Sequence, residues 1–301
     1  MNIAGSLQLG LIYALLALGV FISFRIMNTP DLTADGSFTL GICISTVCTI
    51  GGHPLLAIPA GLIAGAAAGA VTGLLQTKGG IHPILAGILT MTALYSINIF
   101  VMGGSPNLSL LGKATMFTIV QGAMNLKDRN AARHIVILIS SFSSVLILAW
   151  FFKTSLGLQI RATGNNEKMV RASSINTDGM RIIALALANA LIALSGTILA
   201  QYQGYGDING GTGIVIIGLA SVILGEVIIH RGAILFRLLA AAAGATLYRF
   251  IIALALHLNV FPAYMLRFLS AFIVALALVM PNLRVLWGQH LVKKRNILNV
   301  R

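Results

Sequence analysis

The sequence predicts an all-α membrane protein, a polytopic bundle of about nine transmembrane helices that forms a single transmembrane domain over residues 1–301. Of the 301 residues, 57% are hydrophobic and only 9% are charged. A soluble domain of this length has too little interior to hide so much apolar surface. Apolar runs near the 20 residues that a helix needs to cross a bilayer also recur along the chain. Counts of eight or ten crossings fit the pattern as well.

The net charge of +13 arises from 20 Lys and Arg against 7 Asp and Glu. The cations lie scattered between apolar runs and share no stripe, so we expect no nucleic-acid partner. An excess of Lys and Arg in cytoplasmic loops explains the charge more simply. The first cation, Arg25, follows the first apolar run, which is opposite to the polarity of a cleavable signal peptide. The first run is therefore predicted to be a retained span that ends in the cytoplasm.

The first half of the chain contains five predicted spans. They cover residues 4–24, 39–50, 55–75, 84–102 and 135–152. The second is short, and the preceding polar stretch contains Pro30, Gly36, Asp31 and Asp35. One interpretation is a broken, partly re-entrant element, which membranes tolerate where the backbone is buried in protein or lines a watery cavity. The other is an ordinary cytoplasmic loop before a short helix.

Two features of these spans predict contacts inside the bundle. Gly61, Gly65, Gly69 and Gly73 recur at every fourth position, which lines one helix face with bare backbone and allows close helix packing. Asn98 cannot face lipid cheaply, so we expect it to face the bundle interior or a substrate path. Cys43 and Cys48, five apart in one span, are expected to be buried small residues.

Residues 103–133 are predicted to form a polar extracytoplasmic loop. Residues 157–181 are the longest polar interval near the middle of the chain. There Asn165 or Asn166 can cap a helix of about two turns. Met169 and Ala172 lie three apart on one face of that helix, and Asn176 offers the next cap. A solvated connecting loop would need neither feature, so we expect a partner to dock on this segment.

Four further spans are predicted at residues 182–200, 214–229, 234–256 and 263–280, followed by a basic cytoplasmic tail at 282–301. With nine crossings and the N-terminus outside, fourteen cations fall inside and four outside. This count places residues 157–181 in the cytoplasm. A missed or re-entrant segment would reverse the side of the N-terminal half.

A short pattern occurs twice in the chain. Asp31-Leu precedes Gly36 and Gly41, and Asp207-Ile precedes Gly213 and Gly218 with one residue added. In the predicted topology the two copies enter their helices from opposite sides, which is typical of an inverted repeat. Chance recurrence in a chain with 32 Gly is the alternative.

The polar residues favour transport without chemistry on this chain. None of the seven acidic residues lies in the middle of a span, which argues against an ion-coupled carrier. The sequence has no hydrolase motif, metal-ligand cluster or phosphate-binding loop, so we expect no enzymatic activity and no bound cofactor or metal. Arg249 lies inside a span, where it could pair with a helix end or an anionic substrate group. The residues expected to line a substrate path are Asp31, Asp35, Asn98, Asn189, Gln201, Gln203, Asp207 and Arg249.

Residues 157–172, followed by Asn176-Thr-Asp and a small-residue helix with Ser195-Gly, resemble the cytoplasmic coupling segment of ABC importer permeases of the branched-chain amino acid and ribose type. Residues 84–98, 200–204 and 218–226 are similar to the tryptophan/tyrosine subgroup of these permeases. The resemblance extends over roughly residues 4–285.

The resemblance implies a multi-pass subunit in a bacterial cytoplasmic membrane, surrounded by lipid. It implies a second permease copy, two ATPase subunits that hold ATP and Mg, and an extracytoplasmic substrate-binding protein, which Gln201, Gln203 and Asp207 could contact as the alternative to lining the path. The expected substrate is a small solute, with an aromatic amino acid favoured. Residues 161–172 would be the helix that docks on the ATPase. The coupling residues would be Gly157, Arg161, Ala162, Thr163, Gly164, Asn166, Glu167, Met169, Arg171 and Ala172. The alternative function is an ATPase-independent solute or ion facilitator.

Overall fold

The computed structural model describes residues 3–125, 128–229 and 232–257, with isolated positions between 265 and 275. Within these residues, eight helices are long and apolar enough to cross a membrane. The predicted all-α polytopic bundle is therefore confirmed. The ninth predicted span at 263–280 and the basic tail at 282–301 lie outside the continuously described residues.

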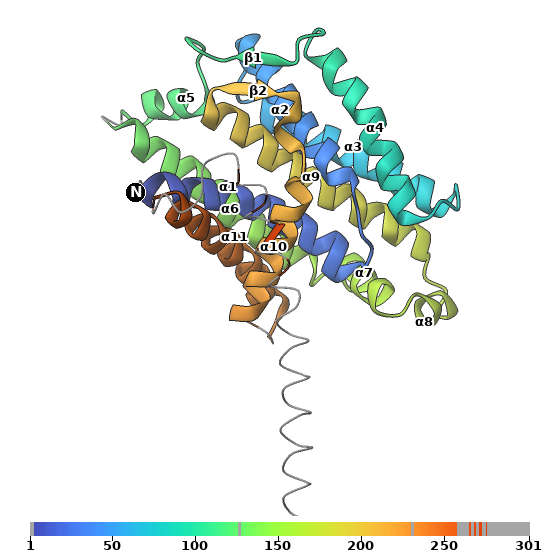
Figure 1. The fold of residues 1–301 in the computed structure, drawn as a ribbon. Coiled ribbons are helices and arrows are strands. Elements are labelled where there is room, and N and C mark those ends of the chain that lie inside the picture. Colours follow the sequence, from blue (N-terminus) through green and yellow to red (C-terminus); the bar gives the residue numbers. More distant parts are fainter. Residues whose placement is uncertain are drawn as a thin grey trace, which may run out of the picture.

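The eight spans include every predicted span up to residue 256 (Figure 1). They are α1 (Ile3–Val20) continued by the π-helix η1 (Phe21–Ile26), α2 (Thr33–Ile50), α3 (Ala57–Thr77), α4 (Pro83–Val101), α6 (Arg129–Phe151), α9 (Thr177–Gln203), α10 (Ile214–Ile228) and α11 (Ile234–His257). The shorter elements are β1 (Asn107–Ser109), α5 (Met116–Ala123), α7 (Ser155–Asn165), α8 (Glu167–Ala172), β2 (Tyr205–Asp207) and the 3₁₀-helix η2 (Ile208–Gly211).

Two predicted boundaries were wrong. The second span begins at Thr33, because Gly36 does not break the helix but faces Leu94 and Met91 of α4. The segment 103–133 is not simply a loop. It contains β1 and α5, and its last residues belong to α6, which begins at Arg129 after the N-cap Asp128.

The short elements gather at opposite ends of the bundle (Figure 1). β1 pairs antiparallel with β2, with Asn107 opposite Asp207, and α5 lies near this pair. We call this end the β end. The helices α7 and α8 lie at the other end, which we call the α8 end. The connection between α6 and α9 therefore lies on the opposite side of the bundle from the connection between α4 and α6.

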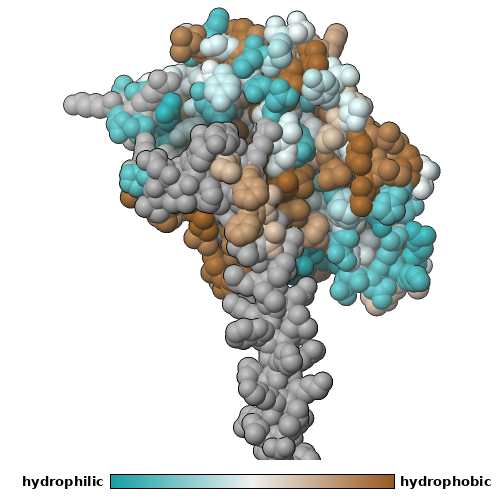
Figure 2. Space-filling model, viewed as in Figure 1, coloured by the Kyte–Doolittle hydropathy of each residue, from teal (hydrophilic) through white to brown (hydrophobic). Residues whose placement is uncertain are grey.

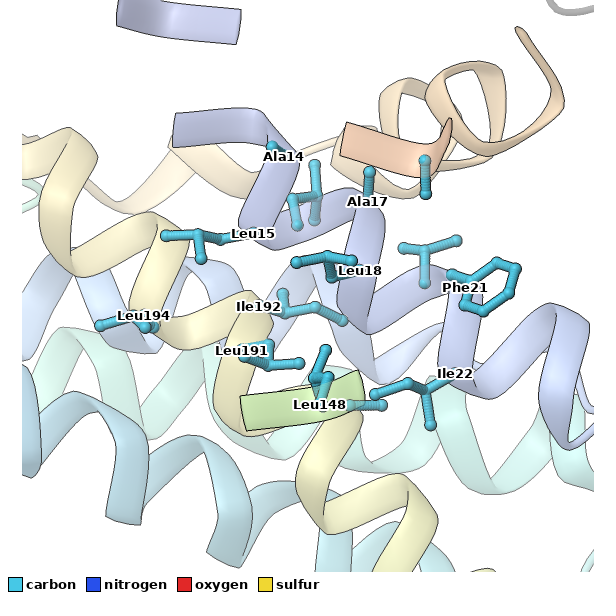
Figure 3. Packing of buried hydrophobic residues seen from close by; sticks show 14 of the residues in the cluster. Ala14, Leu15, Ala17, Leu18, Phe21, Ile22, Leu148, Leu191, Ile192 and Leu194 are labelled. Carbon is cyan, nitrogen blue, oxygen red and sulfur yellow. The ribbon is translucent and has the colours of Figure 1, made fainter. Parts of the chain in front are cut away.

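The helices α1 and α9 form the centre of the bundle. About 78% of each is buried inside the protein, whereas the corresponding share is 28% for α4 and 33% for α3. Ala14, Leu15 and Leu18 of α1 lie close to Leu191, Ile192 and Leu194 of α9 (Figure 3). The Ser195 hydroxyl donates to the Ile12 carbonyl at 2.8 Å, which adds a polar link between the two helices. The outer helices expose many large apolar side chains, which suits a lipid surrounding.

The glycine stripe of α3 packs on α9, as the spacing predicted. A Cβ at Gly65 would lie 2.5 Å from the Ala193 Cβ, and one at Gly73 would lie 2.8 Å from the Ile182 Cα. A Cβ at Gly61 or Gly69 would meet Thr197 or the Leu185 carbonyl. Only glycine allows the two helix backbones to approach this closely.

The helix contacts follow the order expected for a repeat of two sets of three helices. The helix α1 contacts α10 and α11, and α9 likewise contacts α2 and α3. In the same way, α2 contacts α3, and α10 contacts α11. These contacts between helices stay the same when α1, α2 and α3 are exchanged for α9, α10 and α11. The repeated aspartates also match: Asp31 accepts from the Thr33 N–H and Asp207 from the Asn209 N–H, each at 2.9 Å.

Candidate functional site

The predicted coupling segment is a chain of capped short helices. The Asn166 carboxamide accepts from the Met169 N–H at 3.1 Å and caps α8, while Asn176 accepts from the Gly179 N–H at 3.0 Å and caps α9. The predicted caps are thus confirmed. The predicted helix of about two turns is α8, and Asn166, in an extended conformation, separates it from α7, so residues 161–172 form parts of two helices.

Three of the predicted coupling residues hold α7 against the bundle. Gly157 is buried, and an added Cβ would meet the backbone of Phe151 and Phe152. Thr163 is buried, and a Cβ at Gly164 would collide with the Ile26 carbonyl. These residues therefore position the segment and are not free to touch a partner.

The outer face of α8 is available to a partner. Met169 is 57% exposed, and Lys168 and Ala172 are also exposed, whereas Val170 on the opposite face is buried. Figure 2 shows hydrophilic residues gathered at this end of the molecule, below a hydrophobic band. An exposed methionine on a capped helix within this polar surface fits a contact with another protein.

Ion pairs fix α8 relative to α9. The Arg171 guanidinium donates to Glu167 at 3.0 Å and to Asp178 at 3.3 Å, and it also donates to the Thr177 hydroxyl. Arg181 donates to the other oxygen of Glu167 at 2.8 Å. Glu167 and Arg171, both predicted coupling residues, thus make contacts within the chain that set the orientation of α8.

Arg161 and Ala162 line a second feature of this end. They border a cavity of about 540 Å³ together with Arg25 of η1 and Arg237 of α11. Arg25 is paired with Glu226 of α10, and Arg237 lies over the Phe21 ring at 5.3 Å. The segment therefore adjoins the ends of the spans and is not an isolated loop.

A smaller cavity lies between α2, α4 and η2. Its volume is about 290 Å³. The lining residues are Asp35, Gly36, Thr39, Met91, Thr92, Tyr95, Asn98, Ile208, Asn209, Gly211 and Thr212. Of the predicted path residues, the structure brings Asp35 and Asn98 together here. Sequence reasoning missed Met91, Thr92 and Tyr95, although the spacing of Met91 and Tyr95 with Asn98 places these three on one helix face, with Thr92 beside it.

Asp35 joins α2 to the beginning of α10. Its carboxylate accepts from the Gly213 N–H at 2.8 Å and from the Val215 N–H at 3.0 Å. These are free N–H groups of a helix N-terminus, where the helix dipole favours a negative charge. Gly213 has φ +77°, a conformation that favours glycine and turns the chain into α10.

Asn98 faces the bundle interior, as predicted, and is only 1% exposed. Its side-chain amide donates to the Gly36 carbonyl at 3.4 Å. Its carbonyl oxygen has no hydrogen-bond partner among the described residues. Most buried polar atoms are hydrogen-bonded, so an unpaired oxygen beside a cavity is unusual.

The other predicted path residues do not line this cavity. Asp31 and Asn189 form a buried link between α2 and α9, with the Asn189 amide donating at 2.7 Å. Gln201 is buried; its side-chain oxygen accepts a hydrogen bond from the Met116 N–H, and its amide donates to the Ser45 hydroxyl and the Pro54 carbonyl. Asp207 caps η2, and Gln203 is exposed at the end of α9. The Arg249 guanidinium lies 3.9 Å from the Tyr13 ring centroid.

Burial raises the pKa of the Asp31 carboxyl above its ordinary value of 3.8, and hydrogen bonds from Thr33 and Asn189 oppose part of that rise. The hydrogen bond between Asp31 and Asn189 therefore connects the start of α2 to α9, while removal of the Asp31 carboxylate from water costs free energy.

Comparisons with known proteins found a matching family and several similar relatives. The family described as "Branched-chain amino acid transport system / permease component" matches residues 2–281. The tyrosine transport system permease protein of Clostridioides difficile (strain R20291) is 33% identical over 276 residues, which cover 91% of this chain and 90% of the relative. An uncharacterized protein of Rickettsia prowazekii (strain Madrid E) is 33% identical over 85% of this chain and 90% of its own. The ribose import permease protein of Escherichia coli (strain K12) is 28% identical over 74% of this chain and 68% of its own. No solved structure matches the chain.

Proposed function

The chain belongs to the family of branched-chain amino acid transport system permease components, and on that premise we propose that it is the membrane subunit of an ABC importer for an amino acid. The family match over residues 2–281 carries the proposal. An aromatic amino acid is the favoured substrate, because the relative named for tyrosine transport is 33% identical while the one named for ribose import is 28% identical.

We propose that an ATPase subunit, which holds ATP and Mg, docks on the exposed face of α8. Met169 and Ala172 supply the apolar contact, and the exposed Lys168 lies beside them. The ion pairs of Glu167 and Arg171 hold α8 against the start of α9. A displacement of α8 would therefore be transmitted to α9, a helix at the centre of the bundle. An extracytoplasmic binding protein would deliver the substrate at the β end.

A second copy of the chain is proposed to cover the cavity between α2, α4 and η2. Thr92, Tyr95 and Ser96 are exposed on α4 beside or near this cavity. Polar side chains in a span usually face protein or water and rarely face lipid. A partner copy at this face would enclose a substrate path between the two chains.

The test is uptake by the permease reconstituted with its ATPase and binding protein in liposomes. Met169→Glu places a charge in the proposed contact, so we expect loss of ATPase co-purification and a fall of at least about ten-fold in ATP-driven uptake, about 1.4 kcal/mol. Leu111→Glu is the matched control, since Leu111 is 91% exposed at the β end, and it should leave ATPase co-purification unchanged.

Two results would count against the proposal. Unchanged uptake by the Met169→Glu variant would remove α8 as the docking site. Downhill solute movement by the permease alone, without nucleotide, would favour the facilitator instead.

A further inference from the structure

Among the described residues, the cavity between α2, α4 and η2 contains a negative charge without a cationic partner. Asp35 lines it, and the part of the chain that the structure describes places no Lys, Arg or His in its lining. The hydrogen bonds that the carboxylate accepts from Gly213 and Val215 come from neutral backbone N–H groups. Each carboxylate oxygen can accept a further hydrogen bond. The helix N-terminus keeps this carboxylate charged, and its free lone pairs and negative charge suit a positively charged guest.

Asn98 adds a second acceptor. Its side chain is 99% buried, lines the same cavity, and has a carbonyl oxygen without a partner in the described part of the chain. An unpaired buried acceptor costs about 1–3 kcal/mol. Two acceptors of this kind, one of them charged, call for a ligand that supplies several N–H donors and a positive charge. A primary ammonium group has three such donors.

The rest of the lining indicates what the ammonium group is attached to. Met91, Tyr95 and Ile208 give the cavity apolar and aromatic walls. Its volume of about 290 Å³ lies at the lower end of the range for small-molecule sites and exceeds what a bare ion fills. The lining therefore suits a small organic amine with an apolar body.

We propose that Asp35 and the Asn98 carbonyl oxygen bind the α-ammonium group of the transported amino acid, with its side chain against Met91 and Tyr95. This inference rests on the proposed function and deepens it. The cavity would recognise the amino group and not the carboxylate, because the one charged residue in its described lining is acidic.

The experiment uses a single cysteine as a reporter. Thr92 is exposed and lines the cavity, so Thr92→Cys is placed in a chain whose free cysteines are removed by Cys43→Ala and Cys48→Ala. The rate of alkylation by a neutral maleimide is measured on the purified full-length permease. Tyrosine, tyramine, N-acetyltyrosine and sodium chloride are tested as protectants at matched concentrations.

Tyrosine and tyramine carry a primary ammonium group and should slow the alkylation, whereas N-acetyltyrosine should not. Asp35→Asn should weaken protection by about ten-fold or more, since a hydrogen bond to a charged group is lost. Asn98→Leu should weaken it by a smaller factor. Asp31→Asn is the matched control, because Asp31 is a buried carboxylate of the same region that does not line the cavity.

Thermal unfolding and gel filtration confirm that each variant is folded. The inference is overturned if N-acetyltyrosine protects as well as tyrosine, if sodium alone protects, or if Asp35→Asn and Asp31→Asn weaken protection equally. If ATP-driven uptake of an amino acid persists in that case, the proposed function still stands. Protection by tyramine without any amino acid uptake would instead reject the proposed function and keep the amine site.

Discussion

At the scale of single residues, some buried polar side chains connect helices by hydrogen bonds, and others line the cavity between α2, α4 and η2. The sequence predicts that Asp31, Asn189 and Gln201 line a substrate path, but the structure buries all three in hydrogen bonds within the chain. Their roles depend on partners far along the chain, since Asp31 and its partner Asn189 are 158 positions apart. No local pattern shows such a pairing. Asp35 and Asn98 differ only in facing a cavity, which the sequence also cannot show.

The Asp31 link predicts how stability varies with pH. Because burial raises the pKa of this carboxyl above 3.8, the folded protein holds the proton more tightly than the unfolded chain. The protonated Asp31 carboxyl therefore adds its full contribution to the free energy of unfolding below about pH 3.8, and this contribution is lost as the pH rises through the raised pKa of the folded state. Asp31→Asn cannot titrate, so its melting temperature should fall less than that of the wild type between about pH 4 and pH 7. Thermal unfolding in detergent measures the difference, and parallel curves would contradict it.

At the scale of helices, the α3–α9 contact was predictable because the glycine spacing is local. The identity of the partner helix was not predictable, since any helix with small residues could pack against the glycine face of α3. Gly69→Val should destabilise the fold by about 1–3 kcal/mol or more, because the new side chain would meet the Leu185 carbonyl. Ala67→Val is the control, as Ala67 is exposed on the same helix. Equal melting temperatures for the two variants would show that α3 and α9 do not meet along this stripe.

The α8 helix predicts a change in coupling with little change in stability. Glu167→Gln removes the charge that Arg171 and Arg181 share. Partly exposed ion pairs contribute about 0–1 kcal/mol, so the melting temperature should change little. Hydrogen exchange of the α8 amides should nevertheless increase, and ATP-driven uptake should fall. Asp178→Asn removes a single 3.3 Å contact and should have a smaller effect. Unchanged exchange in α8 would show that these pairs do not fix the helix.

At the scale of the whole molecule, apolar length and charge predicted the succession of spans up to residue 256 because both are counted locally. The π-turn at Phe21–Ile26, the early start of α2 and the β1–β2 pair were not predictable. Each depends on distant contacts, such as Gly164 against Ile26 and Asn107 against Asp207. The repeated Asp and Gly pattern pointed to an inverted repeat, and the helix contacts agree with one.

This arrangement predicts that neither half folds alone. The glycine face of α3 is covered by α9, and α1 is covered by α9, α10 and α11, so the N-terminal half would expose its tightest interfaces. Small-residue helix faces are stabilised by van der Waals contact with a partner helix, which lipid replaces poorly. We expect fragment 1–125 to be degraded when expressed alone and to be rescued by co-expression with fragment 126–301. The cut falls after exposed residues that follow α5, away from the helix contacts. Co-purification of the two fragments measures rescue, and a stable, monodisperse fragment 1–125 by itself would mean that the halves do not depend on each other.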